Sequence, residues 1–337
     1  MKMKLLYLGN QLSKHGFNKT TIDTLSEQLR TLGFTVYCAS DKRNAVLRLF
    51  RMVLAIFKYR NTVSYLIIDT YSTSAFWYAF ICSQLARFFK IRYLPILHGG
   101  NLPNRLKNNP RISKMIFDNA YQNVAPSNYL KSIFESEGFK NVILIPNSIE
   151  IKKYVYKERA QLAPKLLWVR AFASIYNPEM AVEVMVLLKQ KYPDAMLTMV
   201  GPDKDGSLQK TKDLANRLGV SISFTGQLEK EVWWELAQEH DIFINTSHFD
   251  NTPVSIMEAM AMGLVVVSTS VGGIPFLLTH QKNAFLVDDG NSVQMAEAID
   301  FLITHGEVAK KNQKSAREFV SQMDWDKIKE KWKVLFK

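Results

Sequence analysis

The sequence predicts an α/β protein with two doubly wound parallel sheets, one in each half of the chain. At 337 residues the chain is too long for one comfortable core, so two domains are expected. Strand-like apolar runs alternate with amphipathic helical patterns in both halves, as right-handed βαβ units require. The run VSYLIIDT at 63–70 is nearly continuously apolar, which is typical of a strand buried on both faces of a parallel sheet.

The elements of the first half follow from their periodicity and their end signals. Gly9 ends the first strand-like run, and Gly33 ends the first amphipathic helix. The expected strands are 4–10, 34–40, 63–70, 92–99, 123–127 and 142–148, and the expected helices are 18–33, about 74–89 and a segment within 110–121.

The second half repeats this plan. A charged linker without clear period is expected near 150–164. The expected domains are 1–152 and 165–320, with a C-terminal helix over 321–337 as a candidate to pack back on the first domain. The expected strands are 165–172, 195–202, 222–226, 241–247 and 264–269, and the expected helices are 177–193, 207–218, 229–239, a short helix ending at Gly263, one near 274–280 and one over about 325–337. Ligands of open α/β sheets bind at the carboxyl ends of the strands, so a cleft between the two sheets is the expected site.

The composition excludes several classes of protein. A hydrophobic fraction of 47% suits a soluble globular chain. Cys38 and Cys82 make neither a disulfide framework nor a zinc site, so a reducing, cytoplasmic location is expected. The longest apolar stretch, 75–89, is interrupted by Gln84 and Arg87, and no transmembrane segment is expected.

The positive charge is confined to one half of the chain. Residues 1–150 hold 20 Lys and Arg against 8 Asp and Glu, whereas residues 151–337 hold 23 of each. This asymmetry predicts a polyanionic surface, membrane or nucleic acid, as a partner of the first half. Residues 44–60 mix cations, including Arg48 and Arg51, with an apolar stripe. The segment is either an interfacial helix or a half-buried helix with a solvated basic edge.

The stretch DNTPVSIMEAMAMG, from Asp250 to Gly263, carries two acids around the start of a short helix. Pro253 suits the first turn, and Thr252 or Asn251 is expected to cap it. The exposed amides of the helix start, those of Val254 and Ser255, then form a ready phosphate site, with Glu258 within reach of a ribose beside the phosphate. Alternatively, Glu258 is a solvated helix residue and Asp250 caps a neighbouring turn.

The sequence around this stretch resembles the donor-site signature of retaining glycosyltransferases of family 4, in the GT-B superfamily. The signature is an acid, seven residues, then glutamate in EAMA-x-G, a strand, and VGG-P. The matching residues here are Asp250, Glu258–Ala261, Gly263, Val271–Gly273 and Pro275. The resemblance extends over about 165–320, is weaker over 120–150, and is weakest in the first 95 residues.

The resemblance implies a GT-B architecture of two Rossmann-like domains and a nucleotide-diphosphate sugar donor in the second domain, with no metal or other cofactor. It implies that Glu258 binds the ribose, that Asp250 faces the donor sugar, and that the residues from Asn251 to Ser255 hold the diphosphate. It also implies that Arg170 neutralises the leaving phosphate and that His98 approaches the sugar. Gly201 and Gly226 match the strand ends that wall the base.

The chain departs from the family pattern in three places. Asp250 stands where glutamate is usual, and Phe276 replaces an acid often found after GG-P. The lysine expected shortly after Arg170 is missing, and Lys204 is the candidate second cation. In the first loop, Lys14 and Gly16 are candidate phosphate or acceptor residues. A metal-binding D-x-D motif at 203–205 is disfavoured by the neighbouring Lys204 and Gly206 and by the resemblance of the chain to GT-B proteins.

We therefore expect metal-independent, retaining transfer of a hexose-type sugar to a glycan or lipid-linked acceptor in envelope polysaccharide biosynthesis, at the inner face of the membrane. The alternatives are a nucleotide-sugar epimerase of the same fold and a non-catalytic partner subunit. Nucleic-acid binding is prompted only by charge, since no RNP, KH or basic-zipper signature is visible. GNQLSKHG is no dinucleotide fingerprint, which disfavours a dehydrogenase.

Overall fold

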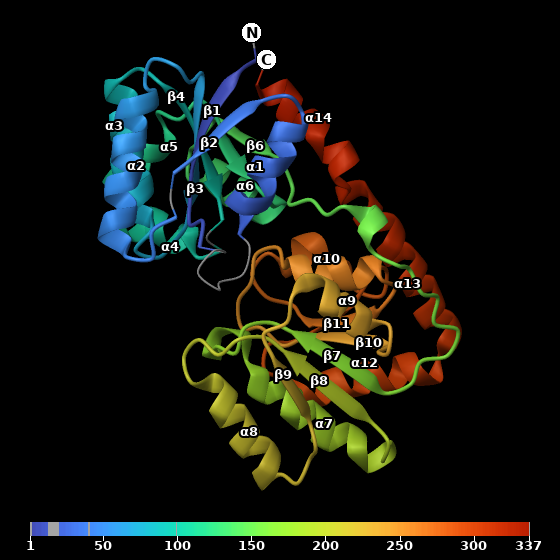
Figure 1. Ribbon diagram of the computed structural model, residues 1–337. Helices are drawn as coiled ribbons and strands as arrows, with labels where there is room; N and C mark the ends of the chain where they lie inside the picture. The colour runs from blue at the N-terminus through green and yellow to red at the C-terminus, as the bar shows by residue number, and fades with distance from the viewer. Residues whose placement is uncertain (1, 13–19, 40, 99, 337) are drawn as a thin grey trace. The chain divides into compact units, whose positions relative to one another are not determined.

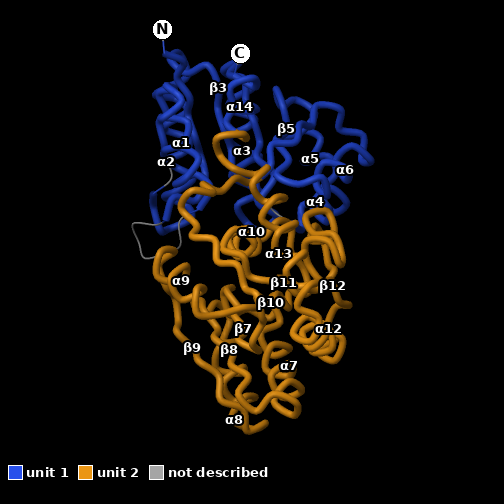
Figure 2. Tube along the Cα trace, turned by 90° about the vertical axis from the view of Figure 1, so that its right-hand side faces the viewer, with its two compact units in different colours: residues 1–146, 329–337 blue, residues 147–328 orange. Residues whose placement is uncertain are grey.

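The computed structural model describes residues 2–12, 20–39, 41–98 and 100–336. The chain divides into two compact units (Figure 2). Unit 1 comprises Met1–Pro146 and Lys329–Lys337, and unit 2 comprises Asn147–Ile328. Each unit is built on its own six-stranded sheet, and all the strand pairs are parallel. The predicted fold class is therefore confirmed.

Unit 1 has the strand order β2-β1-β3-β4-β5-β6, with α1 on one side of the sheet and α2 and α3 next to each other on the other side (Figure 1). Its strands are β1 (Lys4–Leu8), β2 (Thr35–Cys38), β3 (Tyr65–Thr70), β4 (Arg92–Leu97), β5 (Asn123–Ala125) and β6 (Val142–Leu144). Its helices are α1 (Thr21–Thr31), α2 (Ala45–Tyr59), α3 (Phe76–Phe88), α4 (Leu102–Asn108), α5 (Pro110–Phe117) and α6 (Asn128–Ser136). Every residue of β3 is buried, as its nearly continuous apolar run predicts.

Unit 2 has the strand order β12-β11-β10-β7-β8-β9. Its strands are β7 (Lys165–Val169), β8 (Met196–Val200), β9 (Ser223–Gly226), β10 (Ile242–Asn245), β11 (Val265–Thr269) and β12 (Phe285–Val287). Its α-helices are α7 (Pro178–Lys191), α8 (Ser207–Arg217), α9 (Lys230–Ala237), α10 (Val254–Ala261), α11 (Ile274–Leu277), α12 (Ser292–Thr304) and α13 (Gly306–Val320). Short 3-10 helices are η2 (Ile151–Lys153), η3 (Ser174–Tyr176) and η4 (Ser321–Met323).

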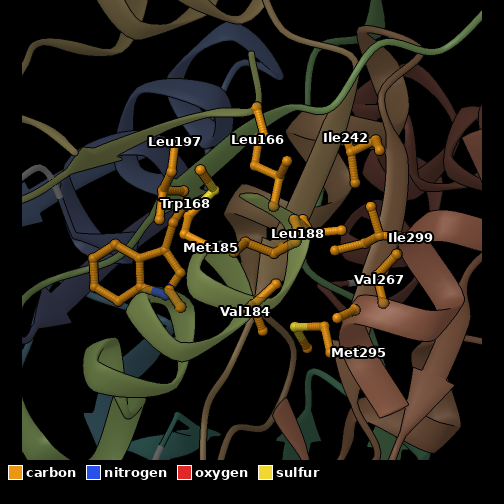
Figure 3. Packing of buried hydrophobic residues seen from close by; sticks show 14 of the residues in the cluster. Leu166, Trp168, Val184, Met185, Leu188, Leu197, Ile242, Val267, Met295 and Ile299 are labelled. Carbon is orange, nitrogen blue, oxygen red and sulfur yellow. The ribbon is translucent and has the colours of Figure 1, made fainter. Parts of the chain in front are cut away.

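The core of unit 2 fills both faces of its sheet. On one face, the side chains of α7 and α12 pack on strand residues such as Leu166, Trp168 and Val267 (Figure 3). The Trp168 indole donates a hydrogen bond to Thr246 Oγ1 at 3.0 Å, so its polar atom is satisfied inside the core. On the other face, α10 and α13 cover strand residues such as Phe243. The sheet is thus a rigid base for the loops at its edges.

Residues 150–164, which the sequence predicts as a linker, pack on unit 2. Arg159 is buried, and its guanidinium donates to the carbonyl oxygens of Ala237, His240 and Met262. A charged side chain inside a segment without periodicity can therefore anchor that segment, because backbone carbonyls satisfy its donors.

The last helix, α14 (Trp325–Leu335), begins in unit 2 and ends in unit 1. Its C-terminal neighbour Phe336 packs edge-on against Phe34 and Tyr65 of unit 1, with ring centroids 5.2 and 5.4 Å apart. Within residues 2–12, 20–39, 41–98 and 100–336, no helix is both long and apolar enough to cross a membrane.

Each sheet has one point where the strand order reverses direction. It lies between β1 and β3 in unit 1 and between β7 and β10 in unit 2. The crevice at the carboxyl ends of the strands beside such a point is where open α/β sheets bind ligands. The loops that follow these four strands are therefore the first places to look for a functional site.

Candidate functional site

An ion pair marks the reversal point of unit 2. Arg170 directly follows β7 and Asp250 lies in the loop after β10, and their side chains form a salt bridge. The guanidinium also lies over the ring of Tyr176, 4.7 Å from its centroid. Burial lowers the pKa of Arg170. Two residues that the sequence analysis assigned to separate roles are thus brought together, with little exposure of either side chain.

Glycines let the neighbouring loops approach this pair. A Cβ on Gly201, after β8, would clash with the carbonyl oxygen of Arg170, and the backbone N–H of Gly201 donates to the carbonyl of Gly226 at 2.8 Å. A Cβ on Gly272 would lie 2.3 Å from the Asp250 carbonyl oxygen. Gly273 donates its backbone N–H to the same oxygen at 2.8 Å. The strand-end glycines and the VGG sequence therefore hold the loops around Arg170 and Asp250.

The start of α10 differs from the expectation. Pro253 is itself the N-cap residue, and no side chain caps the helix, so the expected caps from Thr252 or Asn251 are wrong. Pro253 lacks a side-chain acceptor, and the hydroxyl oxygens of Thr252 and Ser255 are buried without a hydrogen-bond partner. The first amides of α10 are left for a ligand or solvent, which is the arrangement that binds anions at helix N-termini.

Glu258 is not a solvated helix residue, so the alternative reading of this residue is wrong. It is 3% exposed, and its Oε1 accepts hydrogen bonds from Lys230 Nζ at 2.8 Å and from the Tyr154 hydroxyl at 3.1 Å. Burial raises the pKa of Glu258, and the Lys230 ammonium opposes that rise. The described residues make no hydrogen bond to Oε2. One oxygen is thus fixed by the protein, and the other remains an acceptor.

The two acids of the loop at 203–205 form hydrogen bonds within the protein. Asp203 and Asp205 accept hydrogen bonds from backbone N–H groups at the start of α8, and Asp205 also holds Ser174. The hydrogen bond from Ser207 is the largest cause lowering the pKa of Asp205 to about 2. The Lys204 ammonium makes no hydrogen bond or ion pair with the described residues. Among these residues no group of three or more His, Cys, Asp and Glu is placed to hold a metal ion.

A second polar cluster lies at the reversal point of unit 1. His98 follows β4, and its Nε2 lies 2.8 Å from Oδ1 of Asp69, a fully buried side chain near the end of β3. The Tyr7 hydroxyl donates to the same oxygen at 2.8 Å, and Tyr71 stacks on the imidazole with centroids 5.3 Å apart. Burial raises the pKa values of both tyrosines. Gly9 leaves room for Asp69, because a Cβ there would lie 2.3 Å from Oδ2.

Several of these partners are not predicted from the sequence. Lys230 and Tyr154 join Glu258 from 28 and 104 residues away, and Asp69 joins His98 from 29 residues away. The only local hint was an acid, Asp69, inside the apolar run of β3. The predicted loop residues Lys14 and Gly16 lie outside the described residues.

Comparison with known proteins gives this geometry a family context. Residues 156–319, most of unit 2, match the family model described as Glycosyl transferases group 1. An uncharacterized glycosyltransferase of Haemophilus influenzae is 28% identical over 155 residues, which is 45% of this chain and 43% of that protein. The amylovoran biosynthesis glycosyltransferase AmsK of Erwinia amylovora is 31% identical over 133 residues, 38% of this chain and 32% of that protein. The chain spans less than half the length of these relatives.

Solved structures extend the likeness to both units. The sucrose-phosphate synthase of Thermosynechococcus elongatus superposes with a TM-score of 0.82 at 16% identity, covering 99% of this chain and 98% of that one. HepE of Anabaena, in complex with UDP-glucose, superposes with a TM-score of 0.76 at 18% identity, covering 98% of both chains. At these identities the likeness shows the fold. The chain has the GT-B fold class, with two Rossmann-like units.

We predict that Glu258→Gln leaves the fold intact. Because the folded pKa of Glu258 is raised, its contribution to stability is present below the unfolded pKa of about 4.3 and is lost as the pH rises through the folded pKa. The free energy of unfolding of the variant should therefore equal or exceed that of the wild type near neutral pH, with the difference shrinking in acid. Urea unfolding of the wild type and the variant, once near neutral pH and once in acid, tests this. A loss of about 3 kcal/mol or more, as for a broken buried ion pair, would contradict it.

We also predict that Asp69 sets the tautomer of His98. A carboxylate only accepts, so the neutral imidazole must carry its proton on Nε2. In Asp69→Asn the amide can donate as well as accept, and this preference should weaken. ¹⁵N NMR of labelled histidines, with His98→Gln to assign the signal, measures the tautomer. An unchanged His98 tautomer in Asp69→Asn would show that Asp69 does not control it.

Proposed function

We propose that the chain is a metal-independent, retaining glycosyltransferase that moves a hexose-type sugar from a nucleotide-diphosphate sugar to a glycan or lipid-linked acceptor. The observation that carries the proposal is the arrangement at one sheet edge of unit 2. There the Arg170–Asp250 pair lies at the reversal point, and the loop that holds Asp250 leads directly into the uncapped start of α10. Glu258, the fifth residue of α10, is a buried carboxylate.

Sugar transfer from a nucleotide-diphosphate donor requires positive groups at this edge of the sheet. During transfer the bond between the sugar C1 and the diphosphate oxygen breaks, the acceptor oxygen bonds to C1, and the acceptor hydroxyl gives its proton to the departing diphosphate. Negative charge grows on the departing diphosphate, and preorganised donors aimed at it supply catalysis. The guanidinium of Arg170 and the amides of Val254 and Ser255 are such donors. In this proposal the diphosphate draws Arg170 away from part of its contact with Asp250.

Glu258 suits the ribose of the donor. Lys230 and Tyr154 both bind Oε1, so the carboxylate cannot rotate freely, and Oε2 is left to accept from the ribose hydroxyls. We assign Asp250 to the donor sugar and the strand ends at Gly201 and Gly226 to the base. HepE of Anabaena, which has the same fold, was solved in complex with UDP-glucose, and this supports a nucleotide-sugar donor in our proposal.

The roles of His98 and of the acceptor rest on the family resemblance. We propose that His98, held by Asp69, serves the sugar ring. We propose envelope polysaccharide biosynthesis as the process, which the similarity to the amylovoran biosynthesis glycosyltransferase supports. We further propose that the protein acts at the cytoplasmic face of the membrane. No enzyme nucleophile is assigned.

A non-catalytic partner subunit is the second candidate. The lysine expected soon after Arg170 is absent, and the ammonium of Lys204 is exposed without a partner among the described residues. A site with one cation in place of two binds diphosphate more weakly. An epimerase of the same fold is the third candidate, and it would act on a nucleotide sugar without any acceptor.

We predict that one nucleotide family stabilises the protein without metal. In a thermal-shift panel of UDP, GDP, ADP and their common sugars, the matching ligand at a hundredfold excess over its Kd should add about 2.7 kcal/mol to the free energy of unfolding. EDTA should not change the shift, and Glu258→Ala should remove it. Loss of the shift in EDTA would overturn metal independence. Absence of any shift would favour the partner-subunit alternative.

We further predict that Arg170→Ala lowers kcat for sugar transfer by about 10²–10³-fold, the usual effect of removing one preorganised donor to a developing charge. Lys210→Gln, which removes an exposed cation on α8, is the matched control and should leave kcat unchanged. The rate of transfer is measured through the release of the nucleotide, and NMR of the product gives its anomeric configuration. An inverted product would refute the retaining mechanism, and nucleotide-sugar conversion without an acceptor would favour the epimerase.

A further inference from the structure

Unit 1 exposes a row of large apolar side chains on α2. Leu47, Phe50, Leu54 and Phe57 are 56%, 58%, 46% and 43% exposed. Their spacing of three, four and three residues places them along one stripe of the helix. Phe88, at the end of the neighbouring helix α3, is 78% exposed. We call these five residues the apolar face.

The apolar face is not a displaced part of the core. The opposite side of α2 already packs into unit 1 through Met52, Ala55 and Ile56. Arg48, expected as one of the cations flanking the stripe, is instead buried, where its guanidinium donates to the carbonyl of Lys42 and lies 5.6 Å from the ring centroid of Tyr78. Helix α2 is thus anchored on one side while its other side presents apolar groups.

The ends of α2 and α3 join this stripe into one surface. Phe57 packs edge-on against Phe89, with centroids 5.0 Å apart, and Phe89 contacts Phe88 at the same distance. The Arg60 guanidinium lies 5.4 Å from the centroid of Phe89. The two helices lie next to each other in Figure 1. An aromatic cluster with a cation beside it therefore closes one end of the apolar face.

The segment that carries the apolar face is strongly basic. Between Asp41 and Asp118, residues 42–117 contain 13 Lys and Arg and a single acid, Asp69, which is buried beside His98. Arg51 and Lys58 are exposed on α2, and Arg87 and Lys90 are exposed at the end of α3. Unit 1 as a whole holds 24 Lys and Arg against 8 acids, whereas unit 2 holds 19 against 23.

We propose that the apolar face and its cations dock on an anionic lipid bilayer. The aromatic and aliphatic side chains enter the boundary between headgroups and acyl chains, and Arg51, Lys58, Arg87 and Lys90 meet anionic headgroups. A second copy of this surface would be repelled by its like charge. Nucleic acid would account for the cations but leaves the aliphatic Leu47 and Leu54 unexplained. The proposal concerns unit 1 alone, so it stands or falls independently of the donor chemistry.

Vesicle flotation of the full-length chain tests the proposal. Vesicles of phosphatidylcholine with phosphatidylglycerol should bind the wild type, and vesicles of phosphatidylcholine alone should bind it much more weakly. Arg51→Gln/Lys58→Gln should weaken binding about fivefold per cation removed. Phe50→Ser/Leu54→Ser should weaken it at least tenfold, including at raised ionic strength, where the apolar contribution persists while the charge is screened.

Matched variants in unit 2 control for general loss of charge or apolar surface. Val232→Ser/Val293→Ser removes two valines that are 48% and 53% exposed, and Lys210→Gln/Lys282→Gln removes two exposed cations. Both double variants should bind the vesicles as the wild type does. Equal binding to vesicles with and without phosphatidylglycerol would overturn the proposal. So would wild-type binding by Phe50→Ser/Leu54→Ser, which would leave only nonspecific attraction of a basic protein.

Discussion

The ion pair between Arg170 and Asp250 is the constraint on which the reversal-point edge of the sheet in unit 2 depends. It ties together the loops that follow the two strands on either side of the reversal point. Neither charge could stay in this place alone, because a partly buried ion without a partner is costly. The surrounding loops adapt to the pair, since Gly201 and Gly272 pass so close to the backbones of Arg170 and Asp250 that no side chain fits there.

The same edge gathers groups that do not favour stability. The carboxylate of Glu258 has a raised pKa because it is buried, α10 starts without a side-chain cap, and the hydroxyl oxygens of Thr252 and Ser255 are buried without hydrogen-bond partners. Folded proteins usually satisfy such groups. These groups lie on one short helix and in the loop just before it, and this supports our proposal that the segment binds a ligand, because a polar ligand can satisfy them together.

The sequence predicts what depends on local pattern. It predicts the parallel strands, the short helix ending at Gly263 and the placement of Asp250 and Glu258 around the start of that helix. It does not predict elements whose apolar face is chosen by tertiary packing, such as α6, α12, α13 and β12, for which no element was expected. It also misses contacts between distant segments, such as Tyr154 with Glu258. The sequence also does not predict that Pro253 is the N-cap residue, because this depends on the extended backbone ψ angle of Pro253, which the surrounding residue types do not determine.

The two units place their positive charge in different ways, and this difference separates two tasks. Unit 2 has more acids than Lys and Arg, so an anionic ligand is not drawn to it by net charge. Any attraction for a diphosphate must come from a few oriented groups, chiefly Arg170 and the start of α10, which act over a short range and select geometry. Unit 1 instead spreads its cations over exposed helix surfaces, where they act together on an extended anionic surface and select little beyond charge. A protein that must recognise one small anion while remaining at a charged surface benefits from keeping these two kinds of positive charge on separate units, because a strongly basic donor site would bind polyanions indiscriminately.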